Sequence, residues 1–324
     1  MPKGALGTHR SALTGSLANS FSTHRSCLRR GEEPPPSRPR IALTVIPLFH
    51  VTACNASLMS TMMTGSKLVM MRKWDAVEAM ALIEREKVTV TGGVPTIAWQ
   101  LIEHPDRPKY DLSSLESVAY GGAPAAPELV RLIDSDMHVS PSSGWGMTET
   151  SATVTTHAGE DYVHRPDSCG PALPVSDIRI MALDGAHEMP VGEVGELWAF
   201  GPQVVKGYWR NPEATAATFF DGWVRTGDLA RVDAEGFCYI VDRAKDIVIR
   251  GGENIYCIEV ENCLYAHPAV TDAALIGLPH RTLGEIPAAI VHLAPGQEAS
   301  EAALQSWVRA RLAPFKVPER PSRL

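Results

Sequence analysis

The sequence lacks several features that would assign it to a specialised class of protein. Its six cysteines contain no Cys-x-x-Cys pair, so we expect neither a disulfide framework nor a zinc site. A formal net charge of −7 gives no basic excess to attract nucleic acid. With 44% hydrophobic and 21% charged residues, 324 residues predict a globular chain with room for two domains. The unpaired cysteines indicate reduced thiols and a cytoplasmic location.

Residues 41–66 contain no Asp, Glu, Lys or Arg, which is a pattern also found in membrane spans. Pro47, His50, Asn55 and Gly65 interrupt this stretch, and they would be costly in lipid without hydrogen-bond partners. We therefore predict no transmembrane segment, but a buried strand, a functional loop and a buried helix.

Residues 1–40 are rich in Arg and Ser and poor in acidic residues, which is typical of a mitochondrial transit peptide. Within them, four apolar residues recur at helical spacing and predict an amphipathic helix over 11–29: Leu13, Leu17, Phe21 and Leu28.

Further along, expected strands alternate with expected helices, which indicates a parallel sheet and an α/β fold. The strands are expected at 41–46, 67–71, 88–90 and 115–120, and the helices at 55–63, 75–87, 95–104 and 127–133. Short runs separated by Asp-Gly and Glu-Gly pairs make residues 166–243 β-rich. The last 81 residues, 244–324, mix two helices with two strands and predict a small α+β domain.

Two motifs in the α/β part carry residue types suited to a nucleotide. Tyr-Gly-Gly-Ala-Pro ends an expected strand, and the carboxyl ends of parallel strands are where such sheets bind ligands. About 25 residues later comes Gly144-Trp145-Gly146-Met147-Thr148-Glu149. Its indole is a flat surface for stacking, its Thr hydroxyl can donate to phosphate, and its carboxylate is a hard ligand for Mg²⁺.

The stretch from Val241 to Tyr256 packs Arg243, Lys245 and Asp246 before an apolar strand and a Gly251-Gly252 pair. A guanidinium suits ribose and phosphate oxygens, and charged residues at an element boundary suit a hinge. The paired glycines leave room for a ligand or another chain to approach the backbone.

These motifs, in this order, resemble those of the adenylate-forming superfamily, which includes acyl-CoA synthetases, luciferases and peptide-synthetase adenylation domains. The resemblance runs from Pro2-Lys3-Gly4 through Pro47-Leu48-Phe49-His50 and the Thr-Gly-Asp ending at Asp228 to Pro314–Pro318. It implies that a carboxylic acid, fatty or otherwise apolar, reacts with ATP to give an acyl-adenylate, and then with coenzyme A to give a thioester, with Mg²⁺ as cofactor.

The resemblance also implies a role for each matching residue. Catalytic roles fall on Thr148, Glu149 and Lys245, and Glu149 is also the expected metal ligand. The nucleotide is expected to contact Lys3, Gly121, Gly122, Ala123, Trp145, Gly146, Asp228 and Arg243. The acyl group and coenzyme A are expected to contact His50, Gly251 and Gly252.

The expected organisation is an incomplete large domain over 1–243, with an α/β part (1–165) and a β-rich, barrel-like part (166–243), followed by a partial lid domain over 244–324. The match from residue 2 favours a truncated enzyme over a transit peptide, because the phosphate loop starts inside its motif and the family's C-terminal lysine is not reached. Two alternatives stay open: a peptide-synthetase type adenylation domain, and a non-catalytic nucleotide-binding remnant.

Overall fold

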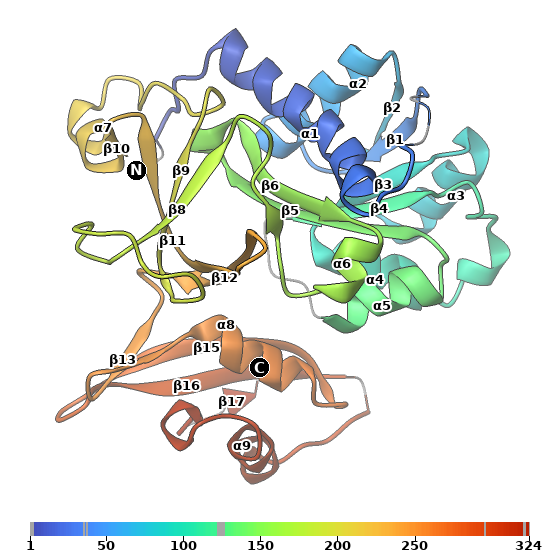
Figure 1. The fold of residues 1–324 in the computed structure, drawn as a ribbon. Helices are drawn as coiled ribbons and strands as arrows, with labels where there is room; N and C mark the ends of the chain where they lie inside the picture. The colour runs from blue at the N-terminus through green and yellow to red at the C-terminus, as the bar shows by residue number, and fades with distance from the viewer. Residues whose placement is uncertain are drawn as a thin grey trace. The chain divides into compact units, whose positions relative to one another are not determined.

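The computed structural model describes residues 3–34, 36, 38–121, 127–294, 296–319 and 322–323 (Figure 1). The chain divides into two compact units. Unit 1 comprises Met1–Thr226 with Arg231–Tyr239, and unit 2 comprises Gly227–Ala230 with Ile240–Leu324. The domain boundary that the sequence indicates after residue 243 stays a prediction.

The first sheet lies in unit 1 and has the strand order β2-β1-β3-β4-β5-β6. Strands β1 to β5 pair in parallel, and β6 pairs antiparallel with β5. The predicted parallel α/β layer is therefore confirmed. The strands are β1 (Ile41–Thr44), β2 (Lys67–Met70), β3 (Val90–Gly93), β4 (Ser117–Gly121), β5 (Ser140–Met147) and β6 (Ala152–Ala158).

Helices and short helical turns connect these strands and cover the sheet (Figure 1). They are α1 (His9–Arg29), the π-helix η1 (Thr52–Met59), α2 (Ser60–Thr64), α3 (Ala76–Glu86), α4 (Pro95–Glu103), η2 (Arg107–Lys109), α5 (Pro127–Ser135), η3 (Thr148–Thr150) and α6 (Glu160–His164). Asp75 starts α3 as predicted, since its carboxylate accepts the Glu78 N–H at 2.8 Å. The core between sheet and helices includes the fully buried Ile83, Leu101 and Ile133.

Helix α1 forms where the apolar spacing predicts it, but its buried face is the opposite one. Leu17 and Leu28 are each 60% exposed and Phe21 is 50% exposed, whereas the helix buries small residues such as Ser11 and Ala18. Ser16 shows why this face packs closely, because its hydroxyl donates to the Asn55 carbonyl of η1 at 3.0 Å. Small side chains let the helix approach its neighbours, and the larger apolar ones point outward.

The second sheet confirms the predicted β-rich part. Its order is β7-β12-β11-β9-β8, with β10 on β11. The predicted turn pairs are real turns, and Gly185, Gly222 and Gly236 all have positive φ there. The elements are β7 (Gly170–Pro171), β8 (Asp177–Met181), β9 (Gly195–Phe200), α7 (Pro212–Thr218), β10 (Phe219–Phe220), β11 (Trp223–Val232) and β12 (Phe237–Arg243).

Unit 2 is the small α+β domain that the sequence predicts. Its sheet has the order β14-β13-β16-β15, with β17 pairing β16, and Val260, Leu264 and Val308 from its helices are buried in one core with Val291 of the sheet. The elements are β13 (Val248–Arg250), β14 (Glu253–Ile255), α8 (Cys257–Tyr265), β15 (Val270–His280), β16 (Gly284–Leu293), α9 (Glu301–Arg309), η4 (Pro314–Lys316) and β17 (Ser322–Arg323). Across the described parts of both units, no helix combines the length and apolar character needed to cross a membrane.

Candidate active site

A tight turn joins β5 to β6 and carries Thr148 and Glu149. The Thr150 hydroxyl is buried in this turn, where it accepts the Met147 N–H at 3.0 Å and donates to the Ala152 carbonyl at 2.9 Å. Ser151 completes the reversal with a φ of 53°. Because Thr150 closes the turn, Thr148 stays exposed and Glu149 half-buried, so both can reach a ligand.

The glycines around Trp145 are explained by the close approach of β5 and β6. A Cβ on Gly146 would lie 1.7 Å from the Ala152 carbonyl oxygen, and one on Gly144 would lie 2.5 Å from that of Thr155. The register also shifts between Trp145 and Gly146. The sheet therefore requires these glycines whether or not a ligand is present, and a nucleotide contact for Gly146 stays a prediction.

Gly121 and Trp145 lie at the same edge of the sheet. Gly121 ends β4 and pairs with Gly144 of β5, directly before Trp145. The half-buried indole packs against a small apolar cluster that includes Val154 and Val224. Stacking of this indole on adenine stays a prediction. Gly122 and Ala123 lie outside the described residues.

Tyr208 joins the two charged residues that the sequence assigns to nucleotide and metal. Its hydroxyl donates to Glu149 Oε1 at 2.5 Å, and the ammonium of Lys3 lies 4.7 Å from the centre of its ring. Burial, followed by the hydrogen bond to Glu149, raises the pKa of Tyr208 to about 12. Sequence reasoning gives Tyr208 no role. The signal that could have found it is an aromatic with a polar end directly after a glycine, Gly207.

His50 has a structural partner in this region. Its Nδ1 accepts the Thr52 N–H at 3.2 Å at the start of η1, and its own N–H donates to the Pro47 carbonyl at 2.9 Å. The exposed imidazole thus supports the loop after β1. Its predicted place beside an acyl carboxylate stays a prediction.

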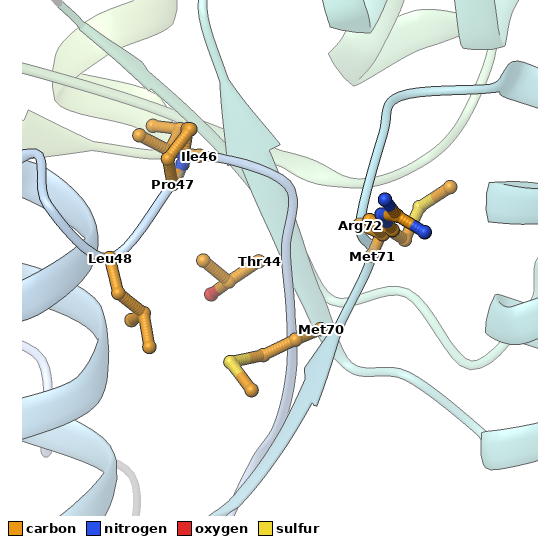
Figure 2. A pocket seen from close by; sticks show the side chains of 7 residues that line it. All are labelled: Thr44, Ile46, Pro47, Leu48, Met70, Met71 and Arg72. Carbon is orange, nitrogen blue, oxygen red and sulfur yellow. The ribbon is translucent and has the colours of Figure 1, made fainter.

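A cavity of about 310 Å³ opens at the carboxyl ends of the paired strands β1 and β2. In Figure 2 the side chains of Leu48, Thr44 and Met70 lie around one space. Most of its wall is apolar, with one guanidinium; the lining residues are Thr44, Ile46, Pro47, Leu48, Met70, Met71 and Arg72. Two residues of the Pro-Leu-Phe-His motif therefore line a cavity suited to an apolar group, while His50 is not among the lining residues.

In unit 2, Asp228 and Arg243 lie side by side on β11 and β12. The guanidinium Nε is 3.4 Å from Asp228 Oδ1, and the Ala244 N–H donates to the Gly227 carbonyl at 2.8 Å. The Asp228 side chain is 14% exposed and that of Arg243 is 60% exposed. The structure thus brings together the two residues predicted for ribose and phosphate in this unit.

The predicted hinge is a turn whose start is fixed by hydrogen bonds to the Asp242 carboxylate. This carboxylate is only 2% exposed, and it accepts the Arg243 N–H at 2.7 Å and the Cys257 N–H at the start of α8. Burial raises the pKa of Asp242. Lys245 and Asp246 follow in the exposed turn, where the Asp246 N–H bonds to the Arg243 carbonyl at 3.0 Å. Sequence reasoning missed Asp242, whose signal is an acidic residue one position before the end of a strand.

Gly251 and Gly252 form a two-residue hairpin between β13 and β14, in which Arg250 pairs with Glu253. Their φ values are 60° and 91°. A type I′ turn needs positive φ at both positions, so the hairpin alone explains two glycines. A Cβ on Gly252 would meet no atom within 4 Å, so its outer side is open.

The donor set at Glu149 fits a magnesium ion shared with a ligand. Within the described residues, no group of three or more His, Cys, Asp or Glu side chains could hold a metal by itself. Mg²⁺ is commonly held by one or two carboxylates together with substrate phosphates and water. A single half-buried carboxylate, with one oxygen engaged by Tyr208, matches that arrangement.

A parallel sheet with a Thr-Glu turn at its carboxyl edge, followed by a small α+β unit, is the arrangement that the family resemblance predicts. Family comparison agrees with this. Residues 1–209 match the model for AMP-binding enzymes, and residues 259–321 match that for the AMP-binding enzyme C-terminal domain. The chain belongs to the family of AMP-binding enzymes, which confirms the resemblance found in the sequence.

Relatives of the chain are named as CoA ligases and synthetases. It is 37% identical over 319 residues to a feruloyl-CoA synthase from an Amycolatopsis species, covering 98% of this chain and 62% of that protein. It is 36% identical to a long-chain-fatty-acid–CoA ligase of Bacillus subtilis, of which it covers 55%. The chain thus spans less than two thirds of these relatives.

A solved structure agrees along the whole chain. The o-succinylbenzoate CoA synthetase of Bacillus subtilis, in complex with its acyl-adenylate intermediate, matches with a TM-score of 0.86 at 31% identity, covering 100% of this chain and 63% of that one. The same synthetase in complex with ATP and magnesium ion matches with a TM-score of 0.85.

Proposed function

We propose that these residues belong to an AMP-forming acid–thiol ligase. In this reaction a carboxylate attacks the α-phosphate of ATP, giving an acyl-adenylate and pyrophosphate, and the thiol of coenzyme A then displaces AMP to give a thioester. The observation that carries the proposal is the cluster in which Tyr208 holds Glu149 and Lys3 at the end of β5. The names of the relatives support it.

In unit 1 the proposed nucleotide contacts surround the turn after β5. Glu149 binds Mg²⁺, which when bound neutralises phosphate charge, and Thr148 and Lys3 donate to phosphate oxygens. Trp145 stacks on adenine. The further proposed nucleotide contacts are Gly121, Gly122, Ala123 and Gly146. Such a site acts by positioning and charge stabilisation, as transfer at phosphorus requires.

In unit 2 the proposed roles are split between strand ends and turns. Asp228 accepts hydrogen bonds from the ribose hydroxyls and Arg243 donates to ribose or phosphate. Lys245 lies in the hinge turn, and the Gly251-Gly252 hairpin faces coenzyme A with the open side of Gly252.

For the acyl group we propose the cavity at the ends of β1 and β2, with His50 near the carboxylate. Its Met, Leu, Ile and Pro lining favours an apolar acid, fatty or aromatic. The free cysteines support a reducing compartment and thus a cytoplasmic location.

The test measures ATP–pyrophosphate exchange that depends on an added carboxylic acid, together with acyl-CoA formation. It uses the full protein that contains these residues and a panel of fatty and aromatic acids. Exchange together with acyl-CoA, detected by mass spectrometry, is the expected result. Exchange with amino acids but no CoA thioester would identify a peptide-synthetase type domain instead. Nucleotide binding without any exchange would identify a non-catalytic remnant.

We further propose that the 324 residues alone give no measurable exchange, because they span less than two thirds of their relatives. Ordinary turnover by the purified 324-residue chain would contradict this.

A further inference from the structure

Tyr208 touches both charged residues of the proposed phosphate and metal site from opposite parts of its side chain. The hydroxyl donates to Glu149 Oε1 at 2.5 Å, while the ring face carries the Lys3 ammonium at 4.7 Å. Glu149 and Lys3 are separated by 146 positions in the sequence. Among the described residues, Lys3 forms no ion pair, and its ammonium contacts the Tyr208 ring instead.

Backbone pairing fixes the strand segment on which Tyr208 sits. The Leu6 N–H donates to the Gly207 carbonyl at 2.8 Å, and the Trp209 N–H donates to the Gly4 carbonyl at 2.7 Å. Glu149 is tied to the same segment, since its carbonyl accepts the Val205 N–H at 2.9 Å. The segment thus brings residues 3–7 and the turn after β5 to one place.

The tyrosine side chain itself is held firmly. It is 7% exposed, and the ring of Phe219 packs edge-on against it at 5.5 Å between centroids. The Tyr208 N–H donates to Thr215 Oγ1 at 2.9 Å. A Cβ on Gly207 would lie 2.5 Å from Thr215 Cγ2, so the backbone sits directly on α7. A buried, well-packed aromatic of this kind gives its hydroxyl one position.

We propose that Tyr208 is a positioning residue: its hydroxyl fixes the Glu149 carboxylate for the metal while its ring holds Lys3 apart from that carboxylate. The inference rests on the proposed function of Glu149. With Oε1 engaged by the hydroxyl, Oε2 is the oxygen presented to a metal–nucleotide complex. Residues that orient a metal ligand in this way typically contribute 10- to 100-fold in metal affinity or activity.

Two substitutions separate the two parts of the role. Tyr208→Phe keeps the ring over Lys3 and removes only the hydroxyl. Tyr208→Leu removes both, and loss of the cation–π contact adds roughly a further two- to fivefold, the range expected for an exposed cation. Tyr208→Phe is nearly isosteric, so its fold is expected to persist, and circular dichroism with thermal melting checks this.

The chain offers a matched control in the same unit. Tyr239 donates its hydroxyl to Asp233 Oδ2 at 3.0 Å, which is also a tyrosine–carboxylate pair, and neither of its residues is among the proposed site residues. Tyr239→Phe therefore removes the same chemical contact without touching Glu149.

The measurement is the affinity for Mn²⁺ in the presence of a non-hydrolysable ATP analogue, followed by electron paramagnetic resonance of the free ion. We expect affinity to fall at least tenfold in Tyr208→Phe and to be unchanged in Tyr239→Phe. In exchange assays on the full protein that contains these residues, the Tyr208→Phe defect should shrink as the metal concentration rises. Equal affinities for wild type and Tyr208→Phe would overturn the positioning role and leave the proposed function standing. A wild-type protein that binds no Mn²⁺–nucleotide would overturn both.

Discussion

The turn after β5 in unit 1 and the turn after β12 in unit 2 both follow a strand and carry the charged residues of a motif, but they hold them differently. In the first, Glu149 is itself held by another side chain, Tyr208. In the second, the held carboxylate is the buried Asp242, while its neighbours Arg243 and Lys245 are exposed. Motif residues that organise a turn and motif residues available to a ligand can therefore be adjacent, and burial distinguishes them.

The largest expected effect tests the first turn. In the full protein that contains these residues, Glu149→Gln keeps the shape of the side chain and removes its charge, so we expect ATP–pyrophosphate exchange to fall by about 100-fold, as for loss of one charge-stabilising group. Melting temperature should hardly change, because the residue is half-buried. Glu188→Gln, which removes the charge of an exposed residue paired with Arg179, is the control. Unchanged exchange at saturating Mg²⁺ would remove Glu149 from the site.

Substitution in the second turn should change the stability of unit 2. Asp242→Ala leaves the Cys257 N–H without its acceptor at the start of α8, so we expect unit 2 to lose about 2 kcal/mol. Hydrogen exchange of the α8 amides measures this locally. Asp246→Ala, in the same turn but exposed, should change stability by less than about 0.5 kcal/mol. Equal effects of the two substitutions would contradict the distinction drawn above.

The two units should also respond to pH with opposite signs. Burial lowers the pKa of His157 in unit 1 from 6.5 to about 4, with smaller opposing effects from the Ser168 carbonyl and Asp161. The folded state keeps this histidine neutral where the unfolded chain binds a proton. The neutral histidine therefore contributes to the stability of unit 1 above pH 6.5. As pH falls toward 4, this contribution is lost and the free energy of unfolding decreases by up to about 3 kcal/mol.

Asp242 behaves in the reverse sense. Its pKa is raised by burial, so its folded form favours the proton, and its contribution is lost as pH rises from 3.8 through the raised value. Urea unfolding between pH 4 and 7, resolved by hydrogen exchange in each unit, checks both signs. His157→Phe should reduce the pH dependence of the unfolding free energy of unit 1 alone. Asp242→Asn should reduce that of unit 2 alone. A slope in unit 1 that survives His157→Phe would assign it to another group.

The smallest expected effect distinguishes a glycine that only the backbone conformation requires from a glycine that also contacts a ligand. Gly252 and Gly192 have φ values of 91° and 89°, and a Cβ on either would meet no atom within 4 Å. Alanine at each should cost about 1 kcal/mol of backbone strain. Thioester formation should fall further only in Gly252→Ala, if its open side faces coenzyme A. Matched losses of activity would mean that the hairpin glycines serve the turn alone.

Much of the fold could be predicted from local patterns. The alternation of strands and helices, the Asp75 cap and the glycine-marked turns are all decided by neighbouring residues, and the structure confirms them. The first helix shows the limit, because spacing locates its apolar stripe but does not say which face the neighbours will cover.

The candidate site was predictable as a set of motifs but not as a set of contacts. Thr148 and Glu149 could be identified by residue type and order. Tyr208 could not, because its hydrogen bond spans 59 positions and depends on how residues 3–7 pair with 206–209. Asp242 was overlooked for a related reason, since its partner is the backbone of a helix start 15 residues away.

The packing of α1 has a consequence for how substitutions along it would be tolerated. In most helices the large apolar positions are the intolerant ones. Here Leu17 and Phe21 can change with little local cost, because at least half of each side chain is exposed. Ser11 and Ala18, which are small and buried, leave no room for larger side chains. In a substitution scan of this helix, the large apolar positions would therefore tolerate changes. The small buried positions, which the sequence pattern does not single out, would be the sensitive ones.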